Sequence, residues 1–232
     1  MLGYYDYTVW LTYASLVSAG TGILVCLNGG GHPYLGIFFL MICGLCDAFD
    51  GKVARSKKNR TDLECKFGIQ IDSLADLVAF GVLPACIGDA MIRVLPTIPE
   101  VARRHTEKLE SFPFVSIFFV IMVVYMLATL IRLAYFNVQE EERQKEEGGV
   151  RKYYSGLPVT SAALIFPVIL SLQYITPFDI TPFYFVAMLL SSLAFLMPIP
   201  VKKPTMKGIM CMVAFGAIIF IALIYEACRN ML

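Results

Sequence analysis

Long apolar runs dominate this 232-residue sequence, and seven of them approach or exceed the length that a helix needs to cross a bilayer. The chain is 58% hydrophobic and only 16% charged, which argues against a soluble globular protein. We therefore expect an all-α fold, a polytopic transmembrane helix bundle that forms a single integral membrane catalytic domain over residues 1–232. The expected spans are 8–27, 34–55, 68–92, 112–138, 157–175, 181–197 and 207–227.

Basic residues gather in alternate links between these spans, at 52–66, 143–152 and 202–207. Such links face the cytoplasm, so we expect a bacterial-type plasma membrane protein whose active site faces the cytoplasm. The link around 93–110 is also basic but falls on the opposite side, so a re-entrant piece or a further span remains an alternative there. The first Lys or Arg is Lys52, so a cleaved signal is not expected.

The seven cysteines lie mainly in apolar runs, a pattern that favours reduced thiols over a disulfide framework. Cys43 and Cys46 form a C-x-x-C pair, but no second pair or nearby histidine completes a ligand set. We interpret the pair as structural.

Four aspartates stand at the ends of two consecutive spans. Asp47 and Asp50 lie near the end of the second span, and Asp72 and Asp76 lie near the start of the third. Spacings of three and four residues place each pair on one helix face. Because a short basic loop joins the two spans, they are expected to run antiparallel and to bring both pairs to one membrane depth. Ionisable residues in spans are functional candidates.

Four carboxylates in one place repel one another unless a cation neutralises them. Ligands that are all oxygen favour Mg²⁺, Mn²⁺ or Ca²⁺, and two such ions can bridge phosphate oxygens while a free carboxylate serves as a base. The alternative is that the aspartates form salt bridges with the neighbouring basic loop.

Small residues surround the aspartates and leave room for a base or a phosphate to approach the backbone. They are Gly51, Ala54 and Gly68. Arg55 follows, where a guanidinium can bind a phosphate or act as an interfacial anchor.

The stretch Asp47-Ala-Phe-Asp-Gly-Lys-Val-Ala-Arg55, followed by Gly68-Ile-Gln-Ile-Asp72-Ser-Leu-Ala-Asp76, resembles the signature of the CDP-alcohol phosphotransferase family, D-x-x-D-G-x-x-A-R…G-x-x-x-D-x-x-x-D. Twelve residues separate Arg55 from Gly68, more than the eight or so usual in that family. The resemblance implies a six-helix core, usually dimeric, and transfer of a phosphoalcohol group from a CDP-linked donor with release of CMP.

The same resemblance implies the roles of the signature residues over 47–76. The metal ligands for Mg²⁺ or Mn²⁺, two ions to a site, would be Asp47, Asp50, Asp72 and Asp76, with Asp76 also the catalytic base. The CDP-binding positions would be Asp47, Gly51, Ala54, Arg55 and Gly68.

Three blocks, at 72–85, 132–137 and 154–158, are similar to the phosphatidylserine synthase branch of the family. They are the run that starts at Asp72, then Arg132-Leu-Ala-Tyr-Phe-Asn137, with Tyr135 where that branch has arginine, and Tyr154-Ser-Gly-Leu-Pro158. The first span lacks the P-N pair often seen in that branch.

The expected substrates are CDP-diacylglycerol and L-serine, with membrane lipid around the chain, a homodimeric assembly and no nucleic acid. The serine carboxylate needs a cation, and the candidates are Arg132, Arg151 and Lys152. Arg132 has an alternative role as a partner of the aspartates. Glycerol 3-phosphate or inositol is the alternative acceptor, and a cation transporter is the alternative from another class.

Overall fold

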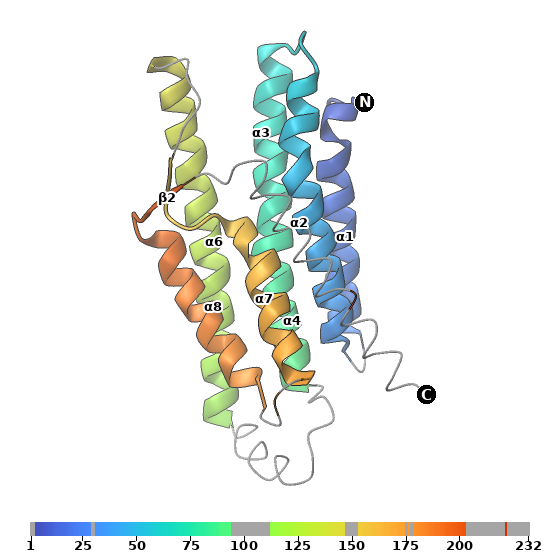
Figure 1. Cartoon of the computed structure of the whole chain (residues 1–232), viewed down its shortest axis with the longest axis vertical. Coiled ribbons are helices and arrows are strands. Elements are labelled where there is room, and N and C mark those ends of the chain that lie inside the picture. The colour runs from blue at the N-terminus through green and yellow to red at the C-terminus, as the bar shows by residue number, and fades with distance from the viewer. Residues whose placement is uncertain are drawn as a thin grey trace.

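The computed structural model describes residues 3–28, 31–93, 112–146, 153–174, 176, 179–202 and 221 as a bundle of long helices (Figure 1). Its α-helices are α1 (Trp10–Leu27), α2 (Pro33–Ser56), α3 (Asp62–Asp76), α4 (Leu83–Arg93), α6 (Phe112–Glu146), α7 (Ala162–Ser171) and α8 (Thr181–Leu196). A π-helix, η2 (Leu77–Val82), joins α3 to α4, and the short 3₁₀ turns are η1 (Tyr7–Val9), η3 (Val159–Ser161) and η4 (Leu172–Tyr174). Two strands, β1 (Tyr153–Ser155) and β2 (Pro200–Lys202), pair antiparallel.

Four helical segments in the described part are long and apolar enough to cross a membrane: Tyr7–Leu27, Pro33–Ser56, Asp62–Arg93 and Ser116–Glu142. Two shorter apolar helices, Val159–Ser171 and Thr181–Leu196, accompany them. Large apolar side chains on α6 and α8 are exposed, as expected of helices that face lipid. The predicted fold class, an all-α polytopic membrane bundle, is confirmed.

The predicted spans match these helices with two corrections at their ends. The third begins at Asp62, six residues before the expected start, and the fourth runs on to Glu146. Hydropathy locates the apolar part of a helix but misses polar turns that continue it into water. The seventh span, 207–227, lies outside the described residues except for Ile221, and so does most of the link at 93–110. The short strand pair was not predicted.

The turn between α2 and α3 is fixed by local side-chain chemistry. Thr61 caps α3: its hydroxyl accepts from the Glu64 amide at 3.2 Å, and the Glu64 carboxylate accepts from the Thr61 amide at 2.8 Å. This capping box satisfies two amides that a helix start leaves open. It sets the first residue of the aspartate-bearing α3.

A proline accounts for the π-helix after Asp76. In an α-helix the carbonyl of Phe80 would accept from the amide of residue 84, but Pro84 has no N–H and its ring crowds that carbonyl. The chain widens here, so that Val78 O accepts from the amide of Leu83 five residues on. The Tyr125 hydroxyl of α6 donates to Phe80 O at 2.7 Å, so this carbonyl has a side-chain donor. Single π turns are often found at functional sites.

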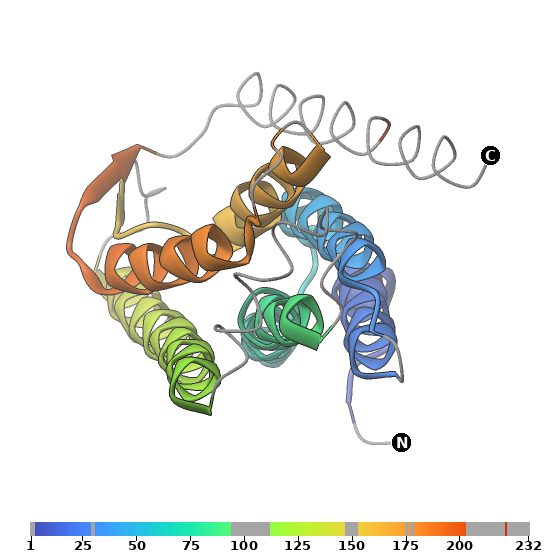
Figure 2. The same ribbon diagram turned by 90° about the horizontal axis from the view of Figure 1, so that it is seen from below.

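Aromatic side chains form the centre of the bundle. The Tyr125 ring packs edge-on against Phe166 with 5.7 Å between ring centroids, and Phe166 lies 4.7 Å from Tyr184. The Tyr184 hydroxyl donates to Pro84 O at 2.8 Å. Seen along the bundle, α4 lies between α1 and α2 on one side and α6 and α8 on the other (Figure 2). The π-helix region is therefore held from both sides.

Candidate active site

The four aspartates lie on two helices that meet at one end of the bundle. Asp47 and Asp50 belong to α2, which ends at Ser56, and Asp72 and Asp76 belong to α3. Asp50 and Asp76 are buried, each 9% exposed, and the other two are half-buried. The sequence predicted the second pair near the start of its helix. Because α3 begins at Asp62, the pair instead stands in the third and fourth turns.

The aspartates are electrostatic neighbours. The carboxyl groups of Asp50 and Asp72 face each other across the two helices, close enough to interact. Asp76 lies within electrostatic range of the other three. The structure therefore brings together two carboxylate pairs that are 22 residues or more apart in sequence.

The salt-bridge alternative does not hold in the part of the chain that the structure describes. The ion pairs found there join Lys57 to Asp6 and Glu64, and Arg93 to Asp89. None involves the four aspartates. Their charges are left for another cation to neutralise.

The donor chemistry of this cluster fits a hard divalent ion, since it offers carboxylate oxygens alone. In the observed side-chain conformations, no three His, Cys, Asp or Glu groups of the described residues are arranged so that they could hold an ion. The two aspartates of each pair share a helix face. Binding of metal remains a proposal.

Each of the two glycines of the signature is covered by a guanidinium. A Cβ on Gly51 would lie 3.2 Å from Nη1 of Arg55, one turn along α2. A Cβ on Gly68 would lie only 2.6 Å from Nη2 of Arg60, which comes from the loop before α3. Ala54 is half-buried one turn beyond Asp50. Sequence reasoning named Arg55 but missed Arg60, which looked like one of several loop cations.

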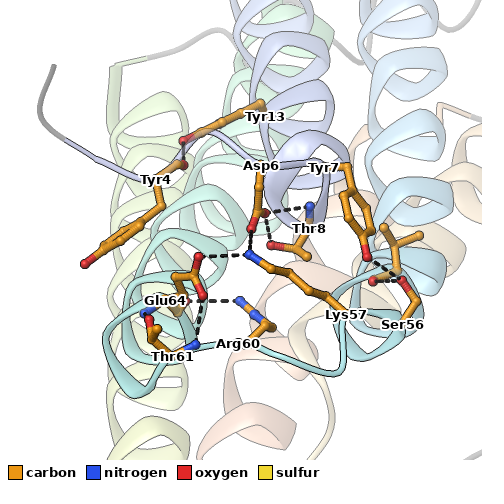
Figure 3. Close-up of polar contacts among 11 residues, drawn as sticks. Tyr4, Asp6, Tyr7, Thr8, Tyr13, Ser56, Lys57, Arg60, Thr61 and Glu64 are labelled. Atoms are coloured by element: carbon orange, nitrogen blue, oxygen red, sulfur yellow. Dashed lines mark hydrogen bonds and ion pairs between the residues drawn. The ribbon is translucent and has the colours of Figure 1, made fainter.

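The loop that joins α2 and α3 is tied to the N-terminal segment (Figure 3). Lys57 Nζ lies 2.6 Å from Asp6 Oδ2 and 2.9 Å from Glu64 Oε1, and we call these three residues the Lys57 clamp. The hydrogen bond from Lys57 lowers the pKa of Asp6 from 3.8 to about 2, with help from the Thr8 hydroxyl. The same carboxylates, Asp6 first, raise the pKa of Lys57. The clamp thus stays fully charged at neutral pH.

Two of the sequence blocks meet beside α3. Arg132, in α6, is 6% exposed, and its Nε donates to Leu157 O at 3.4 Å. Its guanidinium also lies 5.5 Å from the ring centroid of Phe136. Arg132 of the block 132–137 therefore touches the block 154–158, which brings it to the loop before α7. Arg151 and Lys152 lie outside the described residues.

Gly156 makes this junction possible. Its φ of +89° belongs to the region that favours glycine, and a Cβ there would lie 3.0 Å from the carbonyl of Phe195 and 3.1 Å from that of Met197. Its amide donates to Ile199 O at 2.7 Å. The backbone of 156–157 is thereby locked against the end of α8, with the Leu157 carbonyl turned to Arg132.

Comparison with known proteins places these observations in a family. The family model for CDP-alcohol phosphatidyltransferase matches residues 8–227. A yeast protein, the CDP-diacylglycerol–serine O-phosphatidyltransferase of Saccharomyces cerevisiae, is 33% identical over 77% of this chain and 57% of its own length. The protein of that name from Helicobacter pylori strain J99 is 30% identical over 55% of this chain and 44% of its own.

The archaetidylserine synthase of Methanothermobacter thermautotrophicus is 30% identical over 71% of this chain and 57% of its own length. The chain thus spans about half the length of the curated relatives that it matches. The family model covers nearly the whole chain and includes all four aspartates. This chain belongs to the CDP-alcohol phosphatidyltransferase family.

Proposed function

We propose that this protein transfers a phosphatidyl group from CDP-diacylglycerol to the hydroxyl of L-serine, giving phosphatidylserine and CMP. The observation that carries the proposal is the cluster of four aspartates, which has no cationic partner among the described residues and lies beside two glycines covered by guanidinium groups. Two of the relatives are named CDP-diacylglycerol–serine O-phosphatidyltransferase, and a third is named archaetidylserine synthase.

The donor would bind between the aspartates and the glycines. Asp47, Asp50 and Asp72 would hold Mg²⁺ or Mn²⁺, with Asp76 beside them, because carboxylate oxygens suit these ions. Gly51, Ala54 and Gly68 would contact the nucleotide, and Arg55, whose guanidinium lies over Gly51, would bind a phosphate. Bound metal would neutralise charge on the pyrophosphate and make its phosphorus easier to attack.

Asp76 would act as the general base. It would take the proton of the serine hydroxyl as the serine oxygen forms a bond to the phosphorus that carries the diacylglycerol. The bond from that phosphorus to the bridging oxygen breaks, and CMP leaves with that oxygen. The position of Asp76, buried beside the other three aspartates, supports this role.

The serine carboxylate would be bound by Arg132, with Arg151 and Lys152 as further candidates. Arg132 is buried and lies against the loop before α7, on the helix that contacts α3 through Asn137. A buried guanidinium has several N–H donors and pairs well with a carboxylate. The basic loop between α2 and α3 supports an active site that faces the cytoplasm. We propose a homodimer on family resemblance alone.

The test is CMP release by the purified full chain with CDP-diacylglycerol, Mn²⁺ or Mg²⁺, and a panel of serine, inositol and glycerol 3-phosphate. We expect CMP with serine and none when the metal is chelated. CMP release with inositol or glycerol 3-phosphate in place of serine would reassign the acceptor. No CMP with any alcohol would contradict the enzyme itself and favour a transporter.

A matched pair of variants sharpens this test. Asp72→Asn removes a carboxylate of the cluster, and we expect it to abolish CMP release. Asp62→Asn removes an exposed carboxylate from the first turn of the same helix and should leave the rate unchanged. Equal rates in the two variants would show that the cluster plays no part in the reaction.

A further inference from the structure

The loop between Arg55 and Gly68 places a second arginine at the candidate nucleotide site. Arg60 precedes the N-cap of α3, and its side chain runs along the first turns of that helix. Its Nη2 donates to Glu64 O at 3.1 Å and lies 2.6 Å from the position that a Cβ on Gly68 would take. A side chain at residue 68 would push the guanidinium away from this position.

The guanidinium of Arg60 has unused hydrogen-bonding capacity. Its Nε is buried and has no hydrogen-bond partner. A buried donor without an acceptor costs free energy, and that cost is recovered when an acceptor arrives. A phosphate is the acceptor that best matches a guanidinium, since it can take two parallel N–H bonds.

Arg60 is also held in place from both sides (Figure 3). Three residues before it, Lys57 joins the loop to Asp6, and four residues after it, Glu64 closes the capping box and accepts from Lys57. The backbone that carries Arg60 is thus fixed by ion pairs and by a helix cap. Preorganised cations bind anions more tightly than free ones because less side-chain entropy is lost.

We propose that Arg60 is a binding residue for the pyrophosphate of the CDP-linked donor, positioned by the Lys57 clamp. The inference rests on the proposed function, since it assigns a further contact to the same donor site. Arg55 lies over Gly51 of α2, and Arg60 lies over Gly68 of α3, so each aspartate-bearing helix has a guanidinium beside its signature glycine. The sequence between α2 and α3 thereby contributes to donor affinity as well as connecting two helices.

The test compares Arg60→Ala with Lys58→Ala, which removes an equal charge from an exposed position in the same loop. We measure KM for CDP-diacylglycerol and for serine, kcat, and the Kd of CDP in Mn²⁺. Arg60→Ala should raise the donor KM and the CDP Kd about tenfold or more, the worth of a charge-assisted hydrogen bond, while the serine KM stays constant. Lys58→Ala should match wild type, and Arg60→Lys should recover part of the loss.

An Arg60→Ala enzyme with an unchanged or lower donor KM would overturn the inference, because the side chain would then be neutral or would obstruct the site. An equal rise in the serine KM would also overturn it, as that indicates general damage. If alanine lowers the melting temperature, Arg60→Gln, which keeps a donor to the Glu64 carbonyl, replaces it in the same measurements. A wild-type protein that releases no CMP contradicts the proposed function, whereas an active wild type equalled by Arg60→Ala contradicts only the role of Arg60.

Discussion

Ser73 on α3 and Asn137 on α6 are hydrogen bonded to each other, with the Ser73 hydroxyl 3.0 Å from Oδ1 and 2.8 Å from Nδ2 of the amide. Ser73 directly follows Asp72. The contact therefore holds an aspartate-bearing turn of α3 against the helix that carries Arg132. It joins the proposed donor-binding residues to the proposed serine-binding residue.

Asn137→Ala should loosen this junction. Loss of the two hydrogen bonds is expected to cost about 1 kcal/mol of stability and to lower the rate of CMP release several-fold without abolishing it. Thermal unfolding and CMP release in detergent measure the two effects. Gln139→Ala is the control, since it removes a hydrogen bond to Tyr135 within the same helix. If the two variants behave alike, the Ser73 contact has no special role.

Tyr125→Phe tests the explanation of the π-helix. The variant keeps the aromatic packing and removes the hydroxyl that donates to Phe80 O. A buried carbonyl without a donor costs about 1–3 kcal/mol, so the melting temperature should fall. Tyr135→Phe, at an exposed position of α6, should change it little. A variant as stable as wild type would mean that Phe80 O finds another donor.

Asp76→Asn should abolish turnover while the donor still binds. Loss of a general base lowers a rate by about 100-fold or more, whereas an amide still fills the space of the carboxylate. CMP release and equilibrium binding of CDP in Mn²⁺ separate the two effects, and Asp62→Asn serves as the control. Normal turnover in the Asp76 variant would assign the base to another group.

The Lys57 clamp should have a defined dependence on pH. The pKa of Asp6 falls from 3.8 to about 2 in the folded protein, so its contribution to stability is present above about pH 4 and is lost as the pH falls toward 2. Asp6→Asn lacks this contribution at every pH. The difference in melting temperature between wild type and Asp6→Asn should therefore shrink below about pH 4. A difference that stays constant down to pH 2 would exclude the ion pair as its source.

The aspartate pairs were predictable from the sequence because they depend on the spacing of residues within each helix. Spacings of three and four on two adjoining apolar helices already place Asp47 with Asp50 and Asp72 with Asp76. The extra polar turns of α3 were not predicted, since a hydropathy window does not register a capping box at Thr61.

Contacts between distant segments could not be predicted in this way. Asn137 is hydrogen bonded to Ser73, which lies 64 residues away in the sequence. Arg60 was counted with the loop cations because nothing local indicates that its guanidinium reaches Gly68. Such pairings depend on how helices pack, which a single sequence does not reveal.

The π-helix between Asp76 and Leu83 limits which insertions and deletions this sequence can accept as it evolves. A π turn holds about one residue more than the α-helical turn that it replaces, and one residue corresponds to roughly 100° of helix rotation. Deleting a single residue there would remove the extra residue of the π turn, and it would turn the aspartates away from α2 or turn the α4 face away from Tyr184. Point substitutions can occur independently at the two ends of this helix. The number of residues between the aspartates and α4, however, cannot change.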